Sequence, residues 1–438
     1  MAGCAVAPVA IARSTHVKSH TSAVLLLVSL LCLGFGSAPS SAQSAWYRGN
    51  LHTHSLWSDG DDYPEMVVAW YKEHGYQFLA LSDHNRMLVG ERWINTTSNV
   101  SGGVALEKYV KKFGGDWVIQ KEENGQTKVR LRTLEEFRGR FEERAKFLLI
   151  PGEEISDQFK SRPIHLNASN LRELIRPQGG ESVLEVMQND VNAVLAQRKK
   201  TGQAMIPHIN HPNFQWALTA EDIMRVEGER FLEIYNGHPV TKNYGNAQRA
   251  SMERIWDIIL TRRLAELKLE PMWGTAVDDS HSYHEFKHGK SNPGRGWIVV
   301  RATELAPEPI IASLEKGDFY ASTGVRLKEI RRETTRLSIE IDTEPGVTYK
   351  TQFIGTRKGY DPASEPVLEN GKELETTRRY SKDIGMVLAE VDGASPSYQL
   401  KGNEIYVRAK IISSKPKENP MEPGDVECAW VQPVIPRP

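Results

Sequence analysis

NLHTHSLWSDG, residues 50–60, places two histidines one residue apart and follows them with an aspartate five positions later. On a β-strand alternate side chains share a face, so His52 and His54 would point the same way. Two imidazoles on one face suit a single metal ion, whereas an isolated pair of this kind is more often two surface histidines. The choice between these interpretations depends on what the rest of the chain brings to this segment.

The chain has 438 residues, of which 55 are basic and 56 acidic, with a formal net charge of −1. This balance predicts no polyanion-binding face, so we expect a small-molecule substrate and no nucleic-acid partner. The length allows one large domain with an ample core and a second, smaller one.

The first 42 residues have the architecture of a signal peptide. Arg13 and Lys18 precede the apolar run AVLLLVSLLCLGF, 23–35, and small residues at 40–42 suit a cleavage site. The run is short for a membrane span, so we expect no stable membrane anchor, with an uncleaved anchor as the alternative. After cleavage Cys428 alone remains of three cysteines, which excludes an internal disulfide and a thiolate cluster. Export without disulfides favours a bacterial periplasm or a secreted protein.

Beyond the leader, strand-like apolar runs alternate with helical patterns. This alternation predicts an α/β fold with a parallel sheet, closed as a barrel. The expected strands are 47–54, 77–82, 147–150, 203–209, 231–235, 271–276 and 297–301, and the expected helices are 64–74, 182–200, 244–264 and 307–316.

Two segments depart from that alternation. Residues 86 to about 146 contain WVIQKEENGQTKVRLR, which predicts a hairpin turning at Asn124-Gly125. We interpret 86–146 as an insertion near the mouth of the barrel, either a lid or a passive surface elaboration. From about residue 325 the helical patterns stop, and TRLSIEID, YKTQFIG, DIGMVLAEV and EIYVRAKI predict a small antiparallel β domain over 325–438.

Histidines and acids recur mostly where the apolar runs end. In a parallel α/β barrel the loops after the strands build the active site, so side chains at these positions would converge. The residues are His52, His54, Asp83, His84, Glu153, Glu154, His165, His208, His211, Asp278, Asp279 and His281. A single histidine at a strand end is more often structural, but six such motifs in sequence order make coincidence a poor explanation.

The chemistry of these residues is coherent. Imidazoles and carboxylates without thiolates suit Zn, Mn or Fe. More than four such ligands imply more than one ion, and a carboxylate can bridge two ions. Two or three divalent ions a few ångströms apart activate a water and clamp a hydrolysable ester, so the sequence predicts a metal-dependent hydrolase.

Taken in order, the motifs resemble those of the PHP (polymerase and histidinol phosphatase) superfamily over about residues 46–324. The chain matches H-x-H-[ST]-x-x-S-D-G at 52–60, [ST]-D-H at 82–84, G-x-E-[IV] at 152–155, then His165, an H-P pair at 211–212 and a closing D-x-H at 279–281. Within the superfamily the chain looks most like the carbaryl-hydrolase-related (CehA/McbA-like) branch. The basis is the leader, the stretch ASLEKGDFYASTG at 312–324 and the trailing β domain.

The resemblance implies a distorted (β/α)7 barrel over 46–324 with a site for two or three divalent ions. It implies the following ligands: His52, His54, Glu154 and Asp279 for one ion; Glu154, His165 and His211 for a second; Asp59, His84 and His281 for a possible third. Glu154, His211 and His281 are also the catalytic candidates. The chain departs from the family at Asn50, which is often an aspartate, and at Asp59, where some members have a histidine one residue later.

Several assignments have competitors. The open alternatives are Glu153 against Glu154, His208 against His211, and Asp278 as a replacement for or assistant to Asp279. Asp83 either orients His84 or caps a turn, or it is a simple helix N-cap. Asn236 or His238 either touches substrate or forms a structural turn.

Three functions are compatible with these residues. The first is hydrolysis of a phosphoester by a metal-activated hydroxide. The second is hydrolysis of a carboxyl ester, carbamate or amide on the same site. The third is a non-catalytic extracytoplasmic binding protein, which predicts lost ligands, and none of the principal positions is lost.

Overall fold

The computed structural model describes residues 44–97 and 103–436 of the chain. The expected signal peptide, 1–42, lies outside these residues. Ser44–Pro438 form one compact unit. No helix within the described residues is long and apolar enough to cross a bilayer.

The elements that carry the predicted motifs match the expected strands and helices to within a few residues at most ends. The strands are β1 (Ala45–Asn50), β2 (Phe78–Leu81), β6 (Leu148–Phe159), β7 (Arg162–Ser169), β8 (Ile206–Ile209), β9 (Phe231–Asn236), β10 (Trp273–Val277), β11 (Trp297–Ala302) and β12 (Phe319–Ser322). The helices are α1 (Pro64–Glu73), α4 (Val183–Thr201), α5 (Ala220–Ile223), α6 (Met252–Arg262) and α7 (Pro307–Glu315), with short turns η2 (Phe214–Trp216) and η3 (Arg263–Leu267).

Helix α6 begins eight residues later than the predicted 244–264. Ser251 is its N-cap, and the Ser251 hydroxyl accepts a hydrogen bond from the backbone N–H of Arg254. Before the cap, Gly245 has a φ of +66° and its backbone lies against that of Arg249 and Ala250. A turn this tight requires the freedom of glycine, so the chain cannot be helical there.

The β-rich C-terminal segment contains all four predicted strands. Its strands are β13 (Leu327–Arg332), β14 (Arg336–Ile341), β15 (Tyr349–Arg357), β16 (Ser364–Glu365), β17 (Leu368–Glu369), β18 (Lys372–Glu373), β19 (Arg379–Tyr380), β20 (Met386–Asp392), β21 (Ser397–Gln399), β22 (Glu404–Pro416) and β23 (Val426–Val434). Every pairing among them is antiparallel, as expected.

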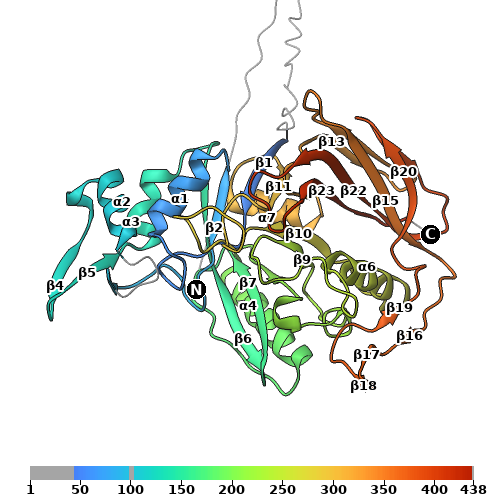
Figure 1. The fold of residues 1–438 in the computed structure, drawn as a ribbon, viewed down its shortest axis with the longest axis horizontal. Coiled ribbons are helices and arrows are strands. Elements are labelled where there is room, and N and C mark those ends of the chain that lie inside the picture. Colours follow the sequence, from blue (N-terminus) through green and yellow to red (C-terminus); the bar gives the residue numbers. More distant parts are fainter. Residues whose placement is uncertain (1–43, 98–102, 437–438) are drawn as a thin grey trace, which may run out of the picture. The chain divides into compact units, whose positions relative to one another are not determined.

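One mixed sheet of 13 strands runs through the described chain, in the order β10-β9-β8-β7-β6-β2-β1-β11-β12-β23-β22-β15-β20 (Figure 1). The β1–β2, β2–β6, β8–β9 and β9–β10 pairs are parallel, as predicted. The sheet is mixed rather than parallel throughout, because β7 is antiparallel to β6 and β8, and β11 is antiparallel to β1 and β12. Two residues, 160–161, join β6 to β7, and so short a connection permits only an antiparallel hairpin.

The closed barrel with seven repeats stays a prediction. Strand β10 lies against β11 and β12. The described strands form no hydrogen-bonded ladder between β10 and either of them. The fold is therefore a mixed α/β arrangement whose sheet continues into the β-rich segment.

Strand β6 is longer than the predicted 147–150. Residues 152–159 pair with β7, so the strand continues through the G-x-E-I motif to Phe159. Glu154 therefore lies within a strand rather than in a loop after it. Helix α4, capped by Ser182 and ended by Gly202 at a φ of 70°, packs on β6 and β7.

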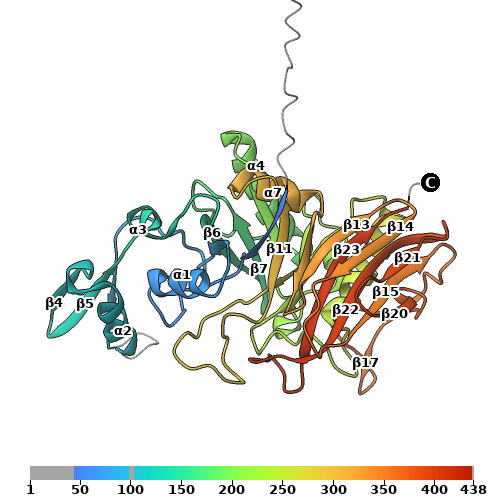
Figure 2. The same ribbon diagram turned by 90° about the horizontal axis from the view of Figure 1, so that it is seen from above.

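The insertion forms its own small sheet, in the order β3 (Arg92–Asn95), β5 (Gln126–Leu131), β4 (Gln120–Glu123). The predicted hairpin is confirmed: Asn124 and Gly125 have φ of 55° and 70°, the backbone that a two-residue turn of this kind needs. The helices α2 (Val104–Phe113) and α3 (Leu134–Phe141) flank it, with the short turn η1 (Gly115–Trp117) (Figure 2). Tyr109 of α2 donates to Glu65 of α1, which anchors the insertion on that helix.

A buried ion pair ties the β-rich segment to α6. Arg408 of β22 donates to both carboxylate oxygens of Asp257 of α6 at 2.7 Å, and the Tyr406 hydroxyl donates to the same carboxylate. Gly385 has a φ of +64° and leaves no room for a Cβ, because Asp257 lies where it would be. The predicted boundary near residue 325 falls between β12 and β13, and a separate β domain stays a prediction.

Candidate metal centre

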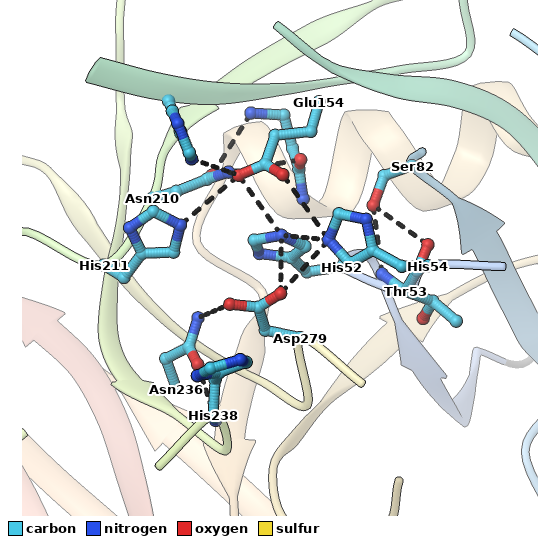
Figure 3. A network of polar contacts seen from close by, with 12 residues as sticks. His52, Thr53, His54, Ser82, Glu154, Asn210, His211, Asn236, His238 and Asp279 are labelled. Carbon is cyan, nitrogen blue, oxygen red and sulfur yellow. Dashed lines mark hydrogen bonds and ion pairs between the residues drawn. The ribbon is translucent and has the colours of Figure 1, made fainter. Parts of the chain in front are cut away.

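The two opening histidines lie just after β1 rather than on it. The strand ends at Asn50, whose side-chain oxygen accepts a hydrogen bond from the backbone N–H of His52. The chain nevertheless stays extended, since Thr53 bridges Ser280 after β10. The alternation holds, and the Nε2 atoms of His52 and His54 lie 3.1 Å apart (Figure 3).

Glu154 of β6 lies at the middle of the cluster and is fully buried. Its Oε1 lies 3.1 Å from His165 Nδ1, 3.3 Å from His211 Nε2 and 3.4 Å from His52 Nε2, and its Oε2 lies 2.7 Å from His84 Nδ1 and 3.4 Å from His54 Nε2. Asn210 donates to the same Oε1 at 2.7 Å (Figure 3). One carboxylate therefore reaches five imidazoles that come from four segments of the chain.

Asp279 forms the second carboxylate of the cluster. Its Oδ1 lies 3.1 Å from His54 Nε2 and 3.2 Å from His52 Nε2. Asn236 donates to its Oδ2 at 3.1 Å. The Asp279 backbone has a φ of 49°, an uncommon conformation that aspartate tolerates better than most residues. Its N–H donates to the carbonyl of His52, which ties this loop to the opening motif.

Asp59 contacts three histidines at the solvent-exposed side of the cluster. Its carboxylate lies 3.3 Å from His281 Nε2, 3.6 Å from His84 Nε2 and 3.7 Å from His54 Nδ1. Its side chain is 52% exposed, whereas His54 is fully buried. The structure thus brings together all nine predicted ligands, and the cluster is buried from solvent at Glu154 and exposed to solvent at Asp59.

Within the described residues, imidazoles are the cationic groups that face the carboxylates of Glu154 and Asp279. Burial by itself raises the pKa of Glu154, but the facing His84 and His52 hold it well below the usual range of a carboxyl. Asp279 behaves in the same way. Within the described residues, every ion pair of these two acids is with a histidine.

The histidines divide into neutral and charged ones. Burial, with His281 and His84 as positive neighbours, lowers the pKa of His54 to about 3. Burial alone would lower the pKa of His52, but the carboxylates of Asp279 and Glu154 raise it well above the usual value. A protonated His52 therefore offsets part of the negative charge of the two buried carboxylates.

This donor set fits divalent cations. His165 Nδ1 and Glu154 Oε2 are buried, and among the described residues they have close ion-pair contacts but no hydrogen bond of suitable geometry. Within the same residues, groups of three or four histidine and carboxylate atoms lie within 4.8 Å of one another, among them His52/His54/Glu154, His84/Glu154/His165 and His54/Asp59/His84/His281. Borderline metals bind such mixtures of imidazole and carboxylate.

The competing residues point elsewhere. Glu153 lies on the other face of β6, where its Oε1 accepts from the N–H of Ile175 and burial raises its pKa to about 8. Asp278 accepts hydrogen bonds from the backbone N–H groups of residues 294–296 and from Tyr71. His208 contacts Glu233 at 3.3 Å instead of Glu154. The geometry therefore places Glu154, Asp279 and His211 in the cluster, while their roles as ligands stay predictions.

The side chain of Asp83 contacts the turn after β1 rather than His84. Its carboxylate accepts from the N–H and hydroxyl of Ser55 and from the hydroxyl of Ser58. It therefore holds the loop that carries His54 and Asp59 in place. The partner was not predictable, because Ser55 and Ser58 meet Asp83 only through the β1–β2 pairing.

Sequence reasoning missed Glu233 and Asn210. Glu233 is fully buried on β9, and its Oε1 lies 2.7 Å from His52 Nδ1. The signal that could have found it is an acid inside the apolar strand FLEIYN, since buried acids are rare unless paired. His238 lies next to His281, at 5.2 Å between ring centroids, so it stays a candidate for substrate contact.

No protein-family model and no curated protein matches the chain. Among solved structures, a two-domain protein of Bacteroides vulgatus, said to contain a PHP-like metal-dependent phosphoesterase, is 14% identical with a TM-score of 0.37, over 89% of this chain and 95% of that one. A protein of Bifidobacterium adolescentis described as a metal-dependent phosphoesterase is 12% identical with a TM-score of 0.28, over 56% and 89%. An amidohydrolase of Chromobacterium violaceum with bound sulfate and no metal is 12% identical with a TM-score of 0.26, over 54% and 88%. Because every TM-score is below 0.5, these likenesses carry no weight for the chemistry of this chain.

Proposed function

We propose that the protein is a metal-dependent hydrolase of the PHP superfamily that cleaves a small phosphoester, after export to the periplasm or exterior of a bacterium. The observation that carries this proposal is Glu154, a fully buried carboxylate with five imidazole nitrogens within 3.4 Å. The export is supported by the leader pattern of the sequence.

The nine residues would hold two or three ions of Zn, Mn or Fe. The first set is His52, His54, Glu154 and Asp279; the second is Glu154, His165 and His211; the third is Asp59, His84 and His281. Ions bound there would activate a water and offset the negative charge of an ester under attack.

The residues of the chain itself set the direction of approach. His52, His54 and Glu154 are fully buried, whereas the side chains of His84 and Asp59 are 29% and 52% exposed. A substrate therefore arrives from the Asp59 side and meets the buried carboxylates last. Asn210 and Asn236 hold Glu154 and Asp279 in fixed orientations, which keeps the site organised before the substrate binds.

A carboxyl ester, carbamate or amide is the second candidate substrate. Within the described residues, no lysine or arginine forms an ion pair with any of the nine. Such cations commonly bind the phosphates of doubly charged monoesters. The charge of the site thus favours a phosphodiester or an uncharged ester over a monoester, and the resemblance of 312–324 to the carbaryl-hydrolase-related branch supports the second class.

One assay separates these functions. Purified, metal-loaded protein is offered a phosphomonoester, a phosphodiester and an aryl carbamate, each releasing nitrophenol. We expect metal-dependent turnover of the phosphodiester, abolished by a chelator. Turnover of the carbamate alone would replace phosphoester chemistry with the second candidate. Bound metal without any turnover would leave the binding-protein alternative.

A further inference from the structure

Glu233 of β9 is the buried acid that none of the metal-binding motifs includes. It accepts four hydrogen bonds, and three of its donors belong to, or lead directly to, residues of the metal centre. We propose that Glu233 is a positioning residue that holds His52, His211 and, through Asn236, Asp279 in register for metal binding. This inference rests on the proposed metal-dependent function.

The contact with His52 sets the proton of that imidazole. Glu233 Oε1 lies 2.7 Å from His52 Nδ1. To bind an ion, His52 must release one of its two ring protons. A carboxylate only accepts, so the proton that remains lies on Nδ1, and the Nε2 lone pair faces Glu154 and Asp279. The opposite tautomer would turn an N–H toward the ion.

The other carboxylate oxygen organises two further segments. Glu233 Oε2 accepts from the backbone N–H of His211 at 2.7 Å and from the side-chain amide of Asn236 at 2.9 Å. The same amide donates to Asp279 Oδ2 at 3.1 Å (Figure 3). One carboxylate thus links the loops after β8 and β10 to the segment after β1.

A glutamine cannot replace Glu233 in this arrangement. All four groups that face the carboxylate serve as donors, and an amide offers one acceptor oxygen and one donor NH₂ group. If the amide oxygen accepts from His52, its NH₂ group faces the N–H of His211 and the amide of Asn236. If it is flipped, the NH₂ group faces His52 and favours the wrong tautomer.

Glu229 offers a matched control near the start of the same strand. It is also fully buried, and it accepts from the backbone N–H of Phe231. Burial raises its pKa well above the usual value, so the group is neutral and Glu229→Gln preserves its charge. Among the described residues, its hydrogen bonds and charged neighbours include no residue of the metal centre.

The test compares wild type, Glu233→Gln, Glu229→Gln and Asn236→Ala as full-length mature chains. Each is stripped with a chelator and titrated with Mn²⁺, and bound ions per chain are counted by elemental analysis. We expect Glu233→Gln to bind metal about 10–100-fold more weakly than wild type, with a smaller loss for Asn236→Ala and none for Glu229→Gln. Turnover of Glu233→Gln should recover as free Mn²⁺ rises, because a higher metal concentration fills the weakened site by mass action, with KM little changed.

The outcomes separate this inference from the proposed function. A wild type that binds no metal overturns the proposed function and this inference together. A wild type that binds metal, with Glu233→Gln and Asn236→Ala binding equally well, overturns the role of Glu233 alone. An equal loss in Glu229→Gln would show that a buried change beside the start of β9 is enough to damage the site, which also rejects the role of Glu233. If Glu233→Gln does not fold, the Asn236→Ala titration decides.

Discussion

Replacing Glu154 by glutamine keeps the size of the side chain and removes its charge. Asn210 donates to Oε1 at 2.7 Å, so the new amide will place its oxygen there and its NH₂ group at the position of Oε2. That position faces His84 and His54. An NH₂ group cannot bind a cation, so the side chain can no longer offer an oxygen to both sets of residues.

The loss of metal and of turnover can be bounded. We expect Glu154→Gln to bind at least one metal ion per chain less than wild type binds. Removing one preorganised electrostatic group from an active site costs about 10²–10³-fold in turnover, and the lost ion adds to this. We therefore expect kcat on a phosphodiester to fall by at least about 10³-fold.

Glu153→Gln is the matched control. Burial raises the pKa of Glu153 to about 8, so the group is protonated at neutral pH and glutamine imitates it. Its oxygen can still accept from Ile175. Metal content and kcat should stay near those of wild type. If Glu153→Gln proves inactive while Glu154→Gln keeps its metal, the orientation of the third motif is wrong by one residue and the reasoning fails.

Four further outcomes are expected. His52→Ala and His54→Ala each abolish turnover and lower bound metal while circular dichroism stays unchanged; full metal occupancy in both would reject them as ligands. Asp257→Asn leaves a buried guanidinium without its bidentate partner and lowers the free energy of unfolding in urea by about 3 kcal/mol; a change near zero would show that the pair does not hold the β-rich segment on α6. Burial raises the pKa of Asp190 to about 7, so between about pH 4 and pH 7 the folded chain keeps a proton that the unfolded chain releases, and the free energy of unfolding falls as pH rises through this range. Asp190→Asn should make the free energy of unfolding less dependent on pH there, and an unchanged pH dependence would contradict the prediction. Glu390→Gln, in the β-rich segment, should leave metal stoichiometry unchanged, and a drop would mean that this segment reaches the site.

Local sequence predicted the elements of this protein because their signals are short-range. Apolar runs and helical spacing located most strands and helices, and Asn124-Gly125 located a hairpin whose turn needs two residues with positive φ. The H-x-H pair could be interpreted locally too, since an extended backbone puts both imidazoles on one side whether or not a ladder forms. The six motifs, taken in order, contain all nine candidate ligands, so these residues could be predicted without the fold.

Tertiary structure decided what depends on partners distant in sequence. The two-residue connection at 160–161 reversed β7 and extended β6, and the β6–β7 pairing turned Glu154 rather than Glu153 toward the histidines. Asp83 accepts from Ser58, which lies 25 residues away along the chain, and Glu233 contacts His52, which lies 181 residues away. A buried acid in a strand shows from its sequence only that it needs a partner; which donors surround it follows from strand order and register, and these are set by the packing of the whole chain.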